Sequence, residues 1–273
     1  KKVACVNSNS DQLSPRSDPQ LDTRSNVLAP IMEEAKAEKP KKRALGELFS
    51  RAFEIYRDNP IMIVPSLLPI AALVLGMLIF AGYVGLIAVF GEGGFVAFSA
   101  LAGLFLFIIL MIVLFLLAEG VTIEMIREAS SGNKADLSYA WQVTGDRMEP
   151  LVLSSLLAGI IVAFGYVLFF IPGLILSFAF YFVAQTVMID DKSGVDALRA
   201  SYRFVEANLS DALIVVLASL AIGAVLPTIP FIGAVLSLLS LPYIYGLATL
   251  LYLDYQEGQE WQSKKPKTVV EVS

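Results

Sequence analysis

The chain has 273 residues, of which 56% are hydrophobic and 16% are charged. Soluble domains carry roughly 25% charged residues, so this composition indicates a membrane protein. The formal net charge of −5 argues against nucleic acid as a partner. The absence of histidine removes the commonest general base and zinc ligand, and a single cysteine excludes an intrachain disulfide.

Residues 1–40 are rich in Ser, Asp, Asn, Pro, Lys and Glu, and show no sustained hydrophobic period. This composition predicts a disordered cytoplasmic tail. We expect a membrane domain over residues 41–255 and a second cytoplasmic tail over residues 256–273. The basic run from Lys39 to Arg43 is expected to contact anionic lipid, at about 1 kcal/mol per basic residue.

Three stretches lack charged residues almost completely: Asn59–Ala118, in which Glu92 is the exception, Pro150–Ile189 and Ala212–Leu253. Each is at least twice as long as the ~20 apolar residues that one transmembrane helix needs. Gly and Pro residues interrupt them at 91–94, 172–173 and 227–233. The sequence therefore predicts an all-α polytopic protein with six transmembrane helices arranged as three hairpins. Spans four and five are the shortest, which leaves either full crossing or partial re-entry open.

The basic residues predict the orientation of these spans. All 20 Lys and Arg residues lie in the N-terminal region, in the two linkers between hairpins, or after span six. The positive-inside rule places these segments in the cytoplasm. We therefore expect a multi-pass protein of the plasma or inner membrane with both termini cytoplasmic.

A segment with helical period precedes each hairpin, and each segment places a small residue before an aromatic one: Ala52-Phe53, Ala140-Trp141 and Ser201-Tyr202. Asn59 and Asn208 follow the aromatic by six residues in the first and third segments, and the second segment looks about two residues longer. The unit recurs three times in one orientation, which predicts a parallel internal repeat.

The segments also carry apolar stripes, such as Val195, Leu198, Tyr202 and Val205 in the third. Stripes with basic flanks predict amphipathic cytoplasmic helices at the membrane interface. Linkers packed against the bundle are the alternative. Within the spans, small residues four apart would permit close helix packing at Ser155-Gly159-Ala163, Ser99-Gly103 and Ser219-Gly223.

One segment, IPGLILSFAFYFVAQTVMIDDKSGVDALRASYRFVEANLSDAL, combines Pro172-Gly173, Asp190-Asp191 with Gly194, Ala197-Leu198 with Ser201, and Asn208 before the next span. This arrangement resembles the family named for the membrane domain of glycerophosphoryl diester phosphodiesterases and related uncharacterised bacterial and archaeal multi-pass families. The resemblance covers residues 45–255 and is most specific over 170–215. It implies a membrane fold and no particular reaction.

No Asp or Glu falls at the centre of a predicted span. The polar candidates for a site lie at cytoplasmic span ends: Glu119, Gln185, Asp211 and Asp254. Ionisable groups in membrane segments are often functional, and these four would together line a cytoplasmic-side pocket. The alternative is that they are hydrated side chains at headgroup level that mark span ends. No catalytic constellation, cofactor site or metal site is predicted.

We therefore expect a non-enzymatic integral membrane protein with a structural, lipid-associated or assembly role, and membrane lipids as its partners. The alternative is a transporter or channel subunit for a small solute or lipid. Prolines within the spans (Pro65, Pro69 and Pro242) and the acidic span ends favour that alternative. A homo-oligomer and a second membrane protein both remain open as partners.

Overall fold

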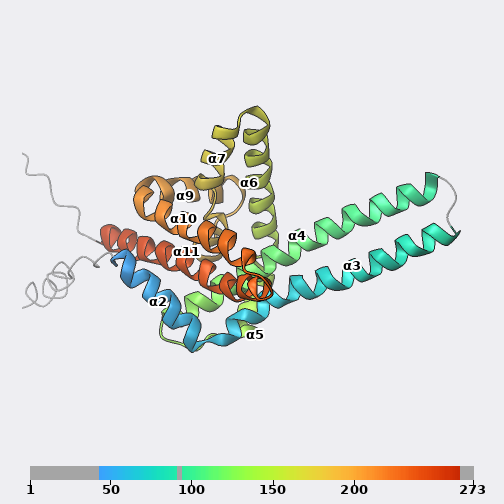
Figure 1. Cartoon of the computed structure of the whole chain (residues 1–273). Coiled ribbons are helices and arrows are strands. Elements are labelled where there is room, and N and C mark those ends of the chain that lie inside the picture. Colours follow the sequence, from blue (N-terminus) through green and yellow to red (C-terminus); the bar gives the residue numbers. More distant parts are fainter. Residues whose placement is uncertain (1–42, 91–93, 265–273) are drawn as a thin grey trace, which may run out of the picture. The chain divides into compact units, whose positions relative to one another are not determined.

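The computed structural model describes residues 43–90 and 94–264, and these form helices without any strand. Figure 1 shows the helices, which in chain order are α2 (Leu45–Asp58), η1 (Pro60–Ile63), α3 (Val64–Phe90), α4 (Gly94–Ser130), α5 (Leu137–Asp146), α6 (Met148–Leu168), α7 (Phe170–Ala179), α8 (Val183–Asp190), α9 (Gly194–Ala207), α10 (Leu209–Val225), η2 (Leu226–Thr228) and α11 (Gly233–Lys264).

Six helical segments are long and apolar enough to cross a membrane: Pro60–Gly85, Phe98–Ser130, Met148–Leu168, Phe170–Asp190, Leu209–Thr228 and Gly233–Ser263. The all-helical class and the six candidate spans are thus confirmed. The fourth and fifth segments have 21 and 20 residues, so each has the length of a full span.

Contacts divide the chain into a unit of residues 42–257 and a unit made of residues 1–41 and 258–273. The first unit contains α2–α10 and most of α11. The predicted tail over 1–40 lies outside the described residues. At the other end, helix α11 continues to Lys264, past the point where the sequence places the start of the C-terminal tail.

Helices α3 and α4 pack side by side (Figure 1). The hydroxyls of Tyr83 and Ser99 are hydrogen-bonded 2.5 Å apart. Nearer the start of α3, the ring of Phe107 lies against Gly76, where an added Cβ would come within 2.1 Å of Phe107 Cε2. Residue numbers rise along α3 as they fall along α4, so the two helices run antiparallel.

The break in the second charge-free stretch occurs at Phe169, three residues before the predicted turn at Pro172-Gly173. Phe169 is extended (φ −158°, ψ 147°) and separates α6 from α7. Pro172 lies in the first turn of α7, where its missing N–H costs no helical hydrogen bond. Gly173 serves close packing, because an added Cβ would lie 2.8 Å from the backbone N of Tyr166.

A second break, at residues 180–182, separates α7 from α8. Both helices pack against α6. Ser177 Oγ donates to Tyr166 Oη at 3.1 Å, and Gly194 N donates to Ser154 Oγ at 2.8 Å. The segment from α7 to the start of α9 therefore runs antiparallel to α6 along most of its length.

The glycines that the sequence patterns singled out for close helix packing are not the ones at which helices approach closely. An added Cβ at Gly103, Gly159 or Gly223 would meet no atom within 4 Å. Close approach instead involves Gly76, Gly120, Gly165 and Gly173. Four-residue spacing is frequent by chance in apolar sequence and does not say which face of a helix meets a neighbour.

The hydrophobic core lies at one end of the candidate spans. Its members come from the last part of α4, the first parts of α6 and α10, all of α8, and the α11 segment Leu247–Tyr252. Helices α2, α5 and α9 contribute buried residues to the same core. The core is therefore at the end where the linkers and basic residues lie. The opposite halves of the spans expose large apolar side chains, as expected for surfaces that face lipid.

The three linker helices share a register of burial. Counted back from the residue that ends each helix (Asn59, Arg147 or Asn208), the seventh position is Ala52, Ala140 or Ser201, and all three are buried. The next residue is aromatic and exposed in each case: Phe53, Trp141 or Tyr202. The end of α5 thus falls six residues after Trp141, without the longer spacing that the sequence suggested.

In α2 and α9 the small side chain at this position lets the linker helix approach a candidate span. Ala52 Cβ lies 3.7 Å from the place where a Cβ on Gly246 of α11 would stand. Ser201 Oγ donates to the carbonyl of Ala179 at 2.8 Å. The predicted stripe of α9 is divided, since Leu198 and Val205 are buried whereas Val195 and Tyr202 are half exposed. At this register position the linkers thus bury the small residue and expose the aromatic residue that follows it, whereas other aromatic residues such as Phe204 of α9 belong to the core.

Candidate functional site

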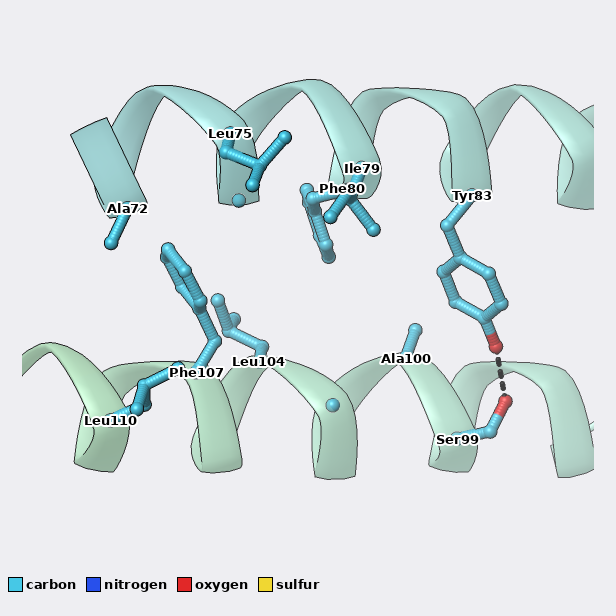
Figure 2. Close-up of a pocket in the computed structure, with 12 residues that line it drawn as sticks. Ala72, Leu75, Ile79, Phe80, Tyr83, Ser99, Ala100, Leu104, Phe107 and Leu110 are labelled. Atoms are coloured by element: carbon cyan, nitrogen blue, oxygen red, sulfur yellow. Dashed lines mark hydrogen bonds between the residues drawn. The ribbon is translucent and has the colours of Figure 1, made fainter.

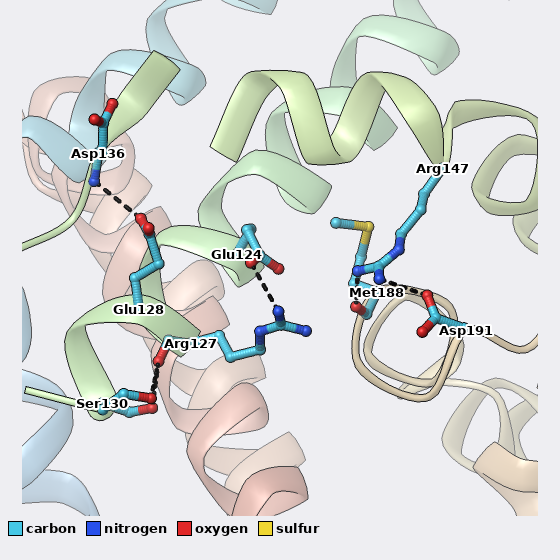
Figure 3. Close-up of polar contacts among 9 residues, drawn as sticks. Glu124, Arg127, Glu128, Ser130, Asp136, Arg147, Met188 and Asp191 are labelled. Atoms are coloured by element: carbon cyan, nitrogen blue, oxygen red, sulfur yellow. Dashed lines mark hydrogen bonds and ion pairs between the residues drawn. The ribbon is translucent and has the colours of Figure 1, made fainter. Parts of the chain in front are cut away.

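A polar cluster surrounds the buried end of α4 (Figure 3). The carboxylate of Glu124 is completely buried, and Arg127, one turn later, places Nη2 3.1 Å from Glu124 Oε1. The pair is close but not aligned as a hydrogen bond, so both oxygens of Glu124 lack a hydrogen-bond donor among the described residues. A buried charge depends strongly on its partner, so Arg127 should matter for folding.

Arg147 joins the corner between α5 and α6 to the end of α8. Its Nη1 donates to the carbonyl of Met188 at 2.5 Å, and its Nη2 pairs with Asp191 Oδ1 at 2.5 Å (Figure 3). The carbonyls in the last turn of a helix have no partner within the helix, and a cation there is favourable. Asp191 ends α8 in the left-handed conformation (φ 55°).

Asp190, the neighbour of Asp191, holds α11. Its carboxylate accepts from Tyr252 Oη at 2.7 Å and from Gln256 Nε2, and it pairs with Lys192 Nζ at 2.8 Å. Tyr252 is buried and packs against Phe204 of α9 with ring centroids 4.9 Å apart. The acidic pair at 190–191 thus fixes the end of α8 to two different elements, one through each carboxylate.

The four candidate residues from the sequence occupy different surroundings. Asp254 pairs with Arg43 at 3.2 Å, which ties α11 to the segment just before α2. Gln185 is buried in α8, and its Oε1 has no hydrogen-bond donor among the described residues. Asp211 lies in the first turn of α10. Glu119 lines a groove that contains none of the other three.

That groove is an apolar hollow among the spans. It encloses about 520 Å³ and is lined by residues of α3, α4 and α11, with Glu119 and Tyr245 among them. A second hollow of about 550 Å³ lies between α3 and α4 (Figure 2), where Phe107 and Leu104 point from α4 toward α3. At its far end the hydrogen bond between Tyr83 and Ser99 joins the two helices.

A third groove, of about 780 Å³, lies where α3 begins and α5 begins. Its apolar wall includes Ile61, Val64 and Leu68, and its polar wall includes Lys134. Trp141 also lines it and is 43% exposed. A basic residue with tryptophan beside apolar helix turns is typical of the membrane–water interface.

Three charged residues with contacts at the core were not singled out as candidates from the sequence: Glu124, Arg127 and Arg147. Arg127 and Arg147 contributed to the sequence-based prediction only as basic residues that indicate the orientation of the spans. The spacing of Glu124 and Arg127 by three residues on one helix was the available signal. Arg147 offered none, because its partner Met188 is 41 residues away and contributes a backbone carbonyl.

Residues 140–254 match the model of a domain of unknown function, DUF7847. The match begins in α5 and ends in α11, so it includes four of the six candidate spans and the Arg147–Asp191 contact. It leaves out α2, α3 and α4, and with them Glu119 and Glu124. Comparison with curated proteins and with solved structures gave no significant match.

Proposed function

We propose that this chain is a non-enzymatic, six-span protein of the plasma or inner membrane with a structural, lipid-associated role. The proposal rests on the observation that several polar side chains at the core end form contacts between helices. Asp190, Arg147 and Asp254 are engaged in contacts between helices. The grooves that remain open are lined mostly by apolar residues, which suits lipid chains.

The finer architecture belongs to this proposal: three hairpins, each preceded by an amphipathic cytoplasmic helix, in a parallel repeat. The shared burial register of α2, α5 and α9 supports it. So do Asn59 and Asn208, whose side-chain amides each donate to the carbonyl four residues earlier, at 3.1 and 3.2 Å. The resemblance to the membrane domain of glycerophosphoryl diester phosphodiesterases is likewise proposed. Its quoted residues fall within the 140–254 match, but that match names no function.

The proposed orientation, with both termini cytoplasmic, is tested by single cysteines in a Cys5→Ser background. Phe231 lies in the exposed turn before α11, and Ser131 lies in the exposed turn after α4. An impermeant thiol reagent added to intact cells should label Phe231→Cys and spare Ser131→Cys. The reverse pattern would overturn the orientation, and labelling of both would overturn the six-span plan.

The lipid-associated role is tested by native mass spectrometry of the full chain released gently from its own membrane. A lipid retained at fixed stoichiometry is the expected result. Lipids present only in membrane proportions, with no retained species, would contradict a specific lipid association. The same spectrum gives the oligomeric state and reveals any second protein chain.

A transporter is the second candidate function, favoured by the position of Glu119 in a groove among the spans. Proteoliposomes that take up a small cation or lipid through the wild-type chain, but not through Glu119→Gln, would support it. Asp254 is a poor site for the same test, because its contact with Arg43 gives it a structural role.

A further inference from the structure

The groove lined by Glu119 has the dimensions of a binding site for one lipid chain. It runs along α4 from Leu104 to Glu119, with Leu73 of α3 and Tyr245 of α11 on its walls. Fifteen residues of α-helix extend about 22 Å. That length exceeds half of the ~30 Å hydrocarbon thickness of a bilayer. A single acyl chain in one leaflet would therefore fit along the groove.

Glu119 gives the groove a single charged end. It is the only charged residue in the lining and is half-buried. Among the described residues no basic side chain forms an ion pair with it. A carboxylate at this depth is costly without a counter-charge. Near Glu119 the lining also contains Phe115, one turn earlier on α4, and Tyr245, and aromatic rings beside a carboxylate favour alkylammonium groups.

We propose that this groove binds an amphiphile with an ammonium head and one long apolar chain. The ammonium lies at Glu119 and Tyr245, and the chain extends along α4 toward Leu104. The site deepens the lipid-associated function proposed above and rests on it. The groove at Lys134 and Trp141 is lined by one basic and one acidic residue, Lys134 and Asp136, and serves as an internal control without a net charge.

The test uses the full chain in phosphatidylcholine nanodiscs and three photoreactive probes. The probes share a sixteen-carbon chain with a diazirine and end in trimethylammonium, hydroxyl or sulfate. Cross-linked peptides are mapped by mass spectrometry. We expect saturable labelling of the 104–119 segment and of the Tyr245 segment by the ammonium probe only. The segments around Lys134 should show no such preference for the ammonium probe.

Three variants identify the group that selects the head. Glu119→Gln should reduce ammonium labelling of the groove about tenfold, the loss expected for one charge-assisted contact in a poorly hydrated site. Glu119→Asp should retain most of the labelling. Glu149→Gln, which removes an exposed carboxylate at the start of α6 outside the groove, should have no effect.

Equal labelling of the groove by the ammonium and hydroxyl probes would overturn the proposal, as would unchanged ammonium labelling in Glu119→Gln. If Glu119→Gln does not fold, the wild-type chain provides the test. The ammonium probe should then label the groove saturably and the hydroxyl probe should not. Uptake of the ammonium probe into proteoliposomes is measured in parallel. Uptake that stops in Glu119→Gln would replace the lipid-associated function by transport while confirming the site. Absence of ammonium labelling of the groove in the wild-type chain, with a lipid still retained in the native mass spectrum, would overturn only the site.

Discussion

The two halves of α4 differ sharply in their surroundings. Near its start, Phe98, Leu101 and Phe105 are each more than 60% exposed, whereas every residue from Val121 to Ile126 is buried. The first half packs against α3 and otherwise offers apolar side chains to lipid. The second half contacts α5, α6 and α8 and contains the ion pair of Glu124. One continuous helix thus connects a helix pair with an exposed apolar surface to a densely packed protein core.

The comparison teaches where folding stability should reside. Burial against lipid contributes little to helix association, because lipid chains are as apolar as leucine. Close packing and polar contacts between helices therefore decide stability, and both are concentrated at the core end. Substitutions there should cost far more than substitutions in the outer part of α3 and α4.

The largest effect is expected from Arg127→Ala. This variant leaves the buried carboxylate of Glu124 without its ion-pair partner, which should lower the free energy of unfolding by about 3 kcal/mol. Chemical denaturation in lipid micelles measures it. Arg199→Ala is the matched control, because Arg199 and Asp196 form an exposed pair with the same three-residue spacing. The double variant Arg127→Ala with Glu124→Gln should recover much of the lost stability, because it removes the buried charge. If Arg199→Ala destabilised the chain as much as Arg127→Ala, the argument would be contradicted.

A second test concerns the close contact of α6 with α7. Gly173→Ala forces these helices apart and should cost about 1–3 kcal/mol of unfolding free energy through overpacking. Gly159→Ala, on an open face of α6, should be neutral or stabilising by up to ~1 kcal/mol, because alanine favours the helix. Thermal unfolding followed by circular dichroism compares the two. Similar costs at both positions would mean that the contact at Gly173 is not what holds α7 to α6.

Tyr252→Phe should have an intermediate effect. It removes the hydroxyl that donates to Asp190 while keeping the ring within the aromatic core, so we expect a loss of roughly 1.5 kcal/mol for a hydrogen bond to a charged group. The half-exposed Tyr202 provides the control substitution Tyr202→Phe, which should be neutral. Chemical denaturation of both variants measures these effects. The denaturation midpoint should fall for Tyr252→Phe and not for Tyr202→Phe, with the denaturant dependence of the unfolding free energy unchanged. Equal midpoints would contradict the role of the Tyr252 hydroxyl.

The smallest effect is expected in the lipid-facing hairpin. Ser99→Ala removes the hydrogen bond to Tyr83 and should cost about 0.6 kcal/mol, the average for interhelical hydrogen bonds within membranes. Hydrogen exchange of the α3 and α4 amides should be faster while that of α8 stays the same. A loss as large as that of Arg127→Ala would show that the outer hairpin is as important for stability as the core.

Much of the fold could be predicted from particular residues. The charge-free stretches indicated six spans, and the break in the second stretch was expected within three residues of its true place. The error arose because Pro172 and Gly173 are usual turn residues, yet the first turn of a helix tolerates proline and Gly173 is required for packing against Tyr166. The candidate site was harder to predict. Asp254 pairs with Arg43, and Glu119 lines a groove with Leu73 of α3 and Tyr245 of α11 on its walls; these three partners are all distant in sequence.

The sequence by itself determined which segments are apolar enough to enter a membrane, because that property is a sum over consecutive residues. It also determined the small and aromatic pair in each linker helix. Only the tertiary structure decided which polar groups meet. Arg147 reaches a carbonyl in α8, Asp190 holds Tyr252 of α11, and Glu119 is left at the end of a groove. Such contacts depend on the rotation and register of packed helices, which no local pattern specifies.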